Sequence, residues 1–276
     1  MAITAADVNK LRQTTGAGMM DCKKALTEAN GDFEAAIDIL RKQGQKVAAK
    51  RADRDASEGL VIAKTTADNT KGVLVCINCE TDFVAKNADF TAMAEKLASI
   101  ALEKGYQSIE AMKAGAFDSN GMSIAEKLIE QTGVIGEKID ISACAAVTAP
   151  FVYAYNHPGN KVASIVGLNK AGFEAAAKDV AMQIAAMGPV ALNKESTPQS
   201  VIDKELEIGK ELAIQEGKPA DMAEKIAQGR LNKFFKESTL LAQEFIKDNK
   251  LTVEQYLKAQ DKELTATDFK RHSLTV

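Results

Sequence analysis

Two cysteines form a C-x-x-C pair, the spacing in this chain that most directly suggests chemistry. Cys76 lies at the end of an apolar run, residues 73–77, and Cys79 follows it. Such a pair can bind zinc or exchange disulfides. On a strand, however, residues three positions apart point to opposite faces, and the sequence has no second C-x-x-C. We therefore expect no metal site, and small buried side chains at Cys22, Cys76, Cys79 and Cys144.

Residue types for acid–base or phosphate chemistry are also sparse. The chain has two histidines and no tryptophan, and it lacks a G-x-x-x-x-G-K-[ST] phosphate loop. The carboxylates of Glu34 and Asp38 are spaced as on a solvated helix face. Residues 16–18 (GAG) lie between two expected helices, whereas a dinucleotide-binding turn follows a strand. These patterns predict no catalytic residue, no cofactor and no enzymatic activity.

The connection after the apolar run 73–77 is unusual. Residues 81–87 read TDFVAKN, so a phenylalanine, Phe83, lies beside an acidic residue, Asp82, where a strand-to-helix connection is usually short and polar. Phe83 either packs against its own helix or inserts into a pocket of a partner. The elements around the connection decide between these two interpretations.

The 81–87 connection joins an expected strand to an expected helix. The run 73–77 is rich in valine and is typical of a buried strand. Asn87 or Asp89 is a suitable N-cap for the helix that follows. Its apolar face has helical spacing and is formed by Phe90, Met93, Ala94, Leu97 and Ile100.

Composition limits the class of protein. A length of 276 residues indicates about two domains. The net charge of −3 argues against nucleic acid as a direct partner. No apolar run approaches the ~18 residues of a spanning helix, and the N-terminus lacks a secretion signal. We therefore expect a cytoplasmic protein with no membrane partner.

The N-terminal part is expected to be helical. Residues 1–45 have the caps and apolar spacing of three short helices, the last of which is expected to end near Gly44. Residues 46–58 follow as a polar, positively charged linker. That charge fits either a solvated spacer or electrostatic attraction to an acidic partner.

The middle of the chain contains one pattern twice. Strand, turn, strand and helix are expected over residues 60–104 and again over residues 151–187. The second copy joins strand to helix through residues 169–172 alone, so the longer 81–87 connection is not required by this unit, which favours a functional role for it. We divide this core at residues 59–137 and 138–260, with the strand near 138–147 opening the second sheet.

The C-terminal third returns to a helical pattern. Two helices, about 200–216 and 219–235, are joined at Gly217-Lys218-Pro219 and form an antiparallel arm within residues 196–236. A helix is expected near 253–259, and the C-terminal segment 261–276 is expected to be loosely ordered towards its end. The fold class is therefore α+β, with a duplicated core of antiparallel sheets and helices.

Three separated motifs closely resemble the bacterial elongation factor Ts family. They are residues 15–26 (TGAGMMDCKKAL, followed by Gly31-Asp32), residues 81–87 (TDFVAKN), and Gly217-Lys218-Pro219 with Ala223-Glu224-Lys225-Ile226 and Gly229-Arg230. Their order matches the family over nearly the whole chain. The resemblance implies a ubiquitin-associated-like N-terminal module, a core of two related subdomains and a coiled-coil arm. It also implies guanine-nucleotide exchange on elongation factor Tu, GDP-bound and nucleotide-free, during polypeptide elongation.

The resemblance also implies contact residues. Asp82 and Phe83, flanked by Thr81 and Val84, match residues that enter the nucleotide-binding domain of Tu. From this match we expect them to displace the Mg²⁺ that accompanies the nucleotide. The N-terminal module and the second subdomain supply further candidates, which are Leu11, Arg12, Met19, Met20 and His157.

Other classes of function remain open on sequence grounds. A ubiquitin-like adaptor would explain residues 1–45 but would give the 81–87 connection and the repeated core no role. Met19 and Met20 could belong to the core of their helix, although adjacent helical positions cannot both point inwards. The charge of Arg12 is compatible with simple solvation, and His157 could be a plain turn residue.

Overall fold

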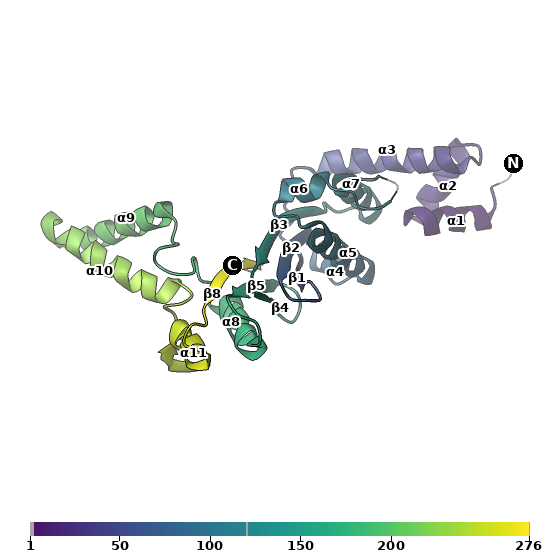
Figure 1. Ribbon diagram of the computed structural model, residues 1–276. Coiled ribbons are helices and arrows are strands. Elements are labelled where there is room, and N and C mark those ends of the chain that lie inside the picture. Colours follow the sequence, from purple (N-terminus) through teal and green to yellow (C-terminus); the bar gives the residue numbers. More distant parts are fainter. Residues whose placement is uncertain (1–2, 120, 276) are drawn as a thin grey trace. The chain divides into compact units, whose positions relative to one another are not determined.

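The computed structural model describes residues 3–119 and 121–275 as a mixture of helices and antiparallel sheets, the expected α+β class (Figure 1). The chain forms two compact units. The first is built mainly from residues up to 62 and from residues 75–145, and the second from residues 63–74 and 146–273. Each unit is described by itself below.

Three helices form the N-terminal module of the first unit: α1 (Ala5–Thr15), α2 (Met19–Glu28) and α3 (Phe33–Arg51). A capping box begins α1, because the hydroxyl of Thr4 accepts from the backbone N–H of Asp7 while the Asp7 carboxylate accepts from that of Thr4. Gly16 ends α1 in a left-handed conformation, φ 72°. The small shared core contains Leu11, Cys22, Ala25, Leu26 and Ala36.

Helix α3 is longer than the sequence predicts. It continues through Gly44, the expected end, to Arg51, so that much of the expected 46–58 linker is helical. Gly44 lies where α3 packs on α7 (Ile124–Ile135), opposite Gly133. The glycine therefore permits a close helix crossing and does not end the helix (Figure 1).

The first sheet has three strands in the order β1 (Glu58–Thr65), β2 (Lys71–Cys79) and β3 (Asp140–Thr148). The expectation that the strand near 138–147 opens the second sheet is therefore wrong. The chain leaves β2 through α4 (Asp82–Ala85), α5 (Ala88–Lys104), α6 (Ile109–Ala114) and α7, and then returns as β3, which lies beside β2. Strand pairing between distant segments is not encoded in the local alternation that the sequence displays.

The second sheet has the same arrangement. Strands β4 (Phe151–Asn156) and β5 (Val162–Leu168) form an antiparallel hairpin, with Phe151 opposite Leu168. The third strand, β8 (Ala266–Ser273), pairs antiparallel with β5. The expected loose order at the end of segment 261–276 is thus wrong for these residues. The charged residues of this segment conceal the strand pattern, and its buried anchors are Leu264, two residues before β8, and Ala266 at the start of β8.

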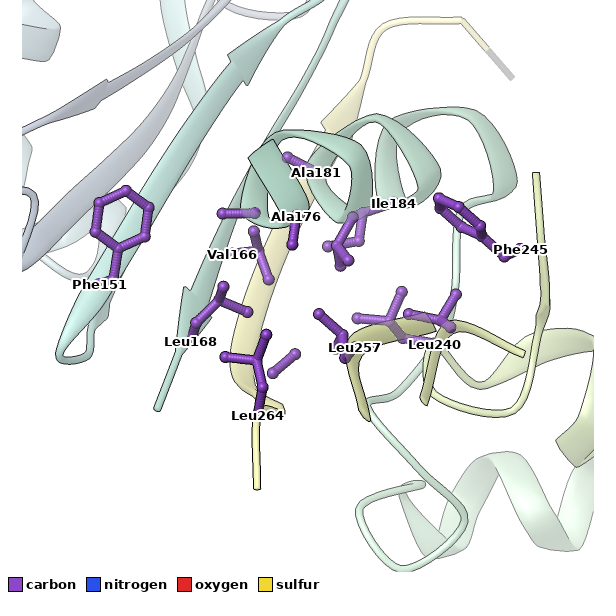
Figure 2. Close-up of a cluster of buried hydrophobic side chains, with 14 residues drawn as sticks. Phe151, Val166, Leu168, Ala176, Ala181, Ile184, Leu240, Phe245, Leu257 and Leu264 are labelled. Carbon is purple, nitrogen blue, oxygen red and sulfur yellow. The ribbon is translucent and has the colours of Figure 1, made fainter. Parts of the chain in front are cut away.

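One apolar core lies between this sheet and the helices of the second unit. Figure 2 shows Val166 and Leu168 of β5 facing Ile184 of α8 (Glu174–Met187) and Leu257 of α11 (Val253–Gln260). All four side chains are fully buried. This core holds the β4–β5 hairpin against α8 and α11.

Two long helices of the second unit form a packed pair. They are α9 (Gln199–Gln215) and α10 (Ala220–Ser238), joined at Gly217, which has φ 76° (Figure 1). Gly209 of α9 lies against Ala227 of α10, and the ion pair of Lys210 with Glu224 also joins the helices. A short hairpin of β6 (Glu244–Phe245) and β7 (Asp248–Thr252) follows. No helix within residues 3–119 and 121–275 is long and apolar enough to cross a membrane.

Candidate functional site

The 81–87 connection forms a single helical turn that presents an aromatic side chain. Residues 82–85 are α4, and Asn87 caps α5 by accepting from the backbone N–H groups of Asp89 and Phe90. Phe83 is 82% exposed, the highest value among the exposed large hydrophobic side chains of the described residues. Phe83 therefore does not pack against its own helix, and its side chain points outwards.

Asp82 lies beside Phe83 on the same turn. Its carboxylate is within 2.6 Å of the Lys86 ammonium group, one helical turn later. This hydrogen bond raises the pKa of Lys86. Both side chains are substantially exposed, so an approaching cation or hydrogen-bond donor can compete for the Asp82 carboxylate.

Glu137 holds the beginning of this turn from behind. One of its carboxylate oxygens accepts from the backbone N–H groups of Glu80 (3.1 Å) and Thr81 (3.0 Å), and the other accepts from the Thr81 hydroxyl (2.7 Å). The Thr81 hydroxyl in turn caps α4 by accepting from the N–H of Val84 at 3.4 Å. Three donors from two consecutive residues thus meet one carboxylate.

Glu80 makes the reciprocal contact. Its carboxylate accepts from the backbone N–H of Lys138 at 2.7 Å and from the Arg51 guanidinium at 2.8 and 2.9 Å. The Lys138 hydrogen bond, followed by the Arg51 contact, lowers the pKa of Glu80. The ammonium group of Lys138 donates to the carbonyl oxygens of Ala52 and Arg54. The end of α3, the 81–87 connection and the start of β3 are therefore tied together.

The candidates in the N-terminal module divide into exposed and buried side chains. Met19 and Met20 are 55% and 64% exposed, and Arg12 is exposed as well. Leu11 is completely buried in the core of the module. The surface of this module therefore presents two flexible thioethers and a guanidinium group, which Leu11 can only support from below.

His157 lies in the turn between β4 and β5 in the second unit. The side chain is exposed, and its Nδ1 is 3.0 Å from the hydroxyl of Tyr155. Both rings border a groove of about 340 Å³. The rest of the lining is mostly apolar and consists of Val162, Met182, Ala185, Ala186, Ile246 and Lys247.

These positions form three sets. Thr81, Asp82, Phe83 and Val84 share one turn, the module candidates lie on α1 and α2, and His157 stands in the second unit. Sequence reasoning missed the supporting residues Glu80, Glu137 and Arg51. The sequence showed Arg51 only as one of the positive charges within the expected 46–58 linker, and no local pattern pairs a carboxylate with a turn more than fifty residues before it.

The cysteines lie outside these sets. All four are free thiols and buried, as expected. Burial raises the pKa of Cys144 to about 11, which keeps its thiol protonated near neutral pH. Among the described residues no three histidine, cysteine, aspartate or glutamate side chains gather in a metal-binding group.

Comparison with known proteins adds an independent finding. Residues 80–275 match the family model described as "Elongation factor TS". A protein named elongation factor Ts from Christiangramia forsetii is 58% identical over 99% of this chain and 98% of its own length. Proteins of the same name from Flavobacterium psychrophilum and Amoebophilus asiaticus are 53% and 52% identical, with at least 98% of each chain covered.

Proposed function

The chain belongs to the elongation factor Ts family, and from that premise we propose that it is a guanine-nucleotide exchange factor for elongation factor Tu. It accelerates the release of GDP from Tu in the cytoplasm, so that GTP can rebind during polypeptide elongation. It forms and breaks no covalent bond. Its partner is Tu in the GDP-bound and nucleotide-free states, and it needs no cofactor, nucleic acid or membrane.

The energetic requirement sets how many contacts are needed. A factor that binds nucleotide-free Tu more tightly than GDP-bound Tu weakens GDP binding by the same ratio. Accelerating release by ~10⁴ requires roughly 5.5 kcal/mol of differential interaction. One buried aromatic anchor typically contributes about 2 kcal/mol or somewhat more. Several contacts must therefore act together.

The exposure of Phe83 is the observation that carries the proposal. An aromatic side chain held 82% exposed on a capped helical turn is available to act as a buried anchor in an interface with a partner. In the proposed complex Phe83 enters the nucleotide-binding domain of Tu while Asp82 competes for hydrogen bonds near the Mg²⁺ site. Thr81 and Val84 flank the insertion. Loss of Mg²⁺ leaves the negative charge of the GDP phosphates uncompensated, and GDP leaves.

The remaining contacts come from the other two sets. Met19, Met20 and Arg12 bind the same domain of Tu from the N-terminal module, with Leu11 maintaining the packing of α1 beneath them. His157 binds a different domain of Tu from the second unit. In this proposal residues 1–45 act as a ubiquitin-associated-like module, the two three-stranded sheets with their helices as related subdomains, and α9 with α10 as a coiled-coil arm.

A release assay tests the proposal. Purified Tu loaded with a fluorescent GDP analogue is mixed with excess GDP and with the wild-type protein or the Asp82→Ala/Phe83→Ala variant. We expect the wild type to accelerate release and the variant to lose most of the acceleration. A folded variant with wild-type release rates would refute the insertion mechanism, and a wild-type protein without effect on Tu would refute exchange itself.

The matched control is Val190→Ala. Val190 is an exposed apolar residue outside the three sets, 47% exposed, so its truncation also removes surface hydrophobicity. We expect its release rates to equal those of the wild type. Circular dichroism of each variant establishes that the fold is intact.

A further inference from the structure

The turn that carries Phe83 cannot hold its own conformation. Helix α4 has only four residues, far fewer than an isolated helix needs for stability. Phe83 points outwards and contributes little packing to the turn, since it is 82% exposed. The buried anchor within α4 is Ala85. The conformation of the turn must therefore be maintained from outside.

Glu137 supplies that support through the residue that caps the turn. The Thr81 hydroxyl can cap Val84 only while its oxygen faces the first turn of α4. Its donation to Glu137 at 2.7 Å fixes the rotation of this hydroxyl. The same carboxylate fixes the backbone on the preceding side by accepting from the N–H groups of Glu80 and Thr81. Carboxylate hydrogen bonds of this kind are among the stronger ones in proteins.

Position and chemistry make Glu137 suitable for this role. It directly follows Gly136, which ends α7 in a left-handed conformation, φ 81°. The backbone N–H of its other neighbour, Lys138, is bonded to Glu80. Glu137 therefore binds the backbone at Glu80 and Thr81, and Glu80 binds the backbone at Lys138. Together these hydrogen bonds join the segment after β2 to the segment after α7.

We propose that Glu137 is a positioning residue that preorganises the Thr81–Phe83 turn for insertion into the partner, and that the exchange activity depends on it although it touches neither Tu nor the nucleotide. This inference rests on the proposed function. Without the carboxylate the turn samples other conformations, and only the fraction in the competent state binds productively.

The test uses the full chain with three variants. Glu137→Ala removes all three acceptor contacts. Glu137→Gln keeps one oxygen for the two N–H groups and offers an amide donor to the Thr81 hydroxyl, so it is the conservative rescue. Glu103→Ala is the matched control, because it removes an exposed carboxylate whose ion pair is with Lys104.

Two measurements are made on each variant. Amide hydrogen exchange reports directly on the N–H groups of Glu80 and Thr81, independently of any partner. Release of the fluorescent GDP analogue from Tu reports on function. For Glu137→Ala we expect faster amide exchange at both positions and about tenfold slower release at limiting concentration, with a competent fraction near one tenth. Glu137→Gln should recover most of both signals, and Glu103→Ala should change neither.

A double-mutant cycle separates positioning from general destabilisation. If Glu137 acts through Phe83, Glu137→Ala should slow release strongly in the wild-type background and little in the Phe83→Ala background. Equal effects in both backgrounds, or wild-type release by folded Glu137→Ala while Phe83→Ala is impaired, would overturn the inference and leave the proposed function intact. Wild-type release by Phe83→Ala itself would overturn both this inference and the insertion mechanism, while exchange itself would stand.

Discussion

Two glycines that face each other where α3 crosses α7 should respond oppositely to the same substitution. An alanine Cβ at Gly133 would lie 2.3 Å from the Cα of Gly44, a separation that side chains do not tolerate. An alanine Cβ at Gly44 would instead lie 3.6 Å from the Cα of Gly133, in ordinary van der Waals contact. The crossing is therefore asymmetric, and Gly133→Ala and Gly44→Ala form a matched pair.

The magnitude follows from two opposing effects. Replacing glycine by alanine inside a helix favours folding by about 1 kcal/mol, and this gain applies to both variants. Overpacking typically costs about 1–3 kcal/mol and applies only to Gly133→Ala, because its close neighbour is backbone that cannot rotate away. The shared gain cancels in the comparison, so Gly133→Ala should be less stable than Gly44→Ala by about 1–3 kcal/mol.

Urea unfolding followed by far-ultraviolet circular dichroism measures this difference, since the chain has no tryptophan for fluorescence. We expect the urea midpoint of Gly44→Ala to lie at or above that of the wild type, and the midpoint of Gly133→Ala to lie at or below it. Equal midpoints for the two variants, or a higher midpoint for Gly133→Ala, would show that the helices do not approach as closely as described and would refute the reasoning.

Three further predictions concern other parts of the chain. Leu264→Ala should destabilise the protein by about 2–5 kcal/mol in urea unfolding, because this fully buried side chain anchors the approach to β8. Tyr256→Phe should remove the last phase of a spectroscopic tyrosine titration, because burial and the hydrogen bond to Asp179 raise the pKa of Tyr256 to about 12. The folded protein lowers the pKa of Glu80, so as pH falls below 4.5 the unfolded chain is protonated at Glu80 before the folded protein is, and the wild type loses stability. Glu80→Gln lacks this titration, so its melting temperature should fall less steeply in acid than that of the wild type.

Local patterns predicted most of the elements. Capping residues such as Thr4 and Asn87 act on neighbouring N–H groups, so their effect is readable from adjacent positions. The repeated hairpins were predicted for the same reason, whereas the sequence left open whether Phe83 packs against its own helix or points outwards. The errors concern long-range packing: the pairing of β3 with β2 and of β8 with β5 depends on partners far away in the sequence.

The candidate site divides in the same way. The candidate contact residues Asp82 and Phe83 stand out in the sequence because an acidic residue and an aromatic residue lie side by side in a strand-to-helix connection. The residues that hold them, Glu80 and Glu137, are common acidic residues whose role depends on where two chain segments meet. Leu11 was a contact candidate on the family resemblance, but its side chain is completely buried. A resemblance in sequence does not distinguish a residue that contacts a partner from a core residue beneath the contact surface.

The pairing of β5 with β8 has a consequence for synthesis of the chain. During synthesis, β5 is hydrogen-bonded on both sides only after β8 has been made, because Leu168 of β5 pairs with Ala266 of β8. The residues between the two strands include all of α9, α10 and α11. Until then the growing polypeptide carries an open edge of Val, Ile and Leu residues, which is a site for unwanted strand addition. The helix pair α9–α10, whose contacts are local, can fold while that edge is still open. Because β8 is synthesised after β5 and all of these helices, the sheet closes only after them, when β8 adds to the open edge of β5.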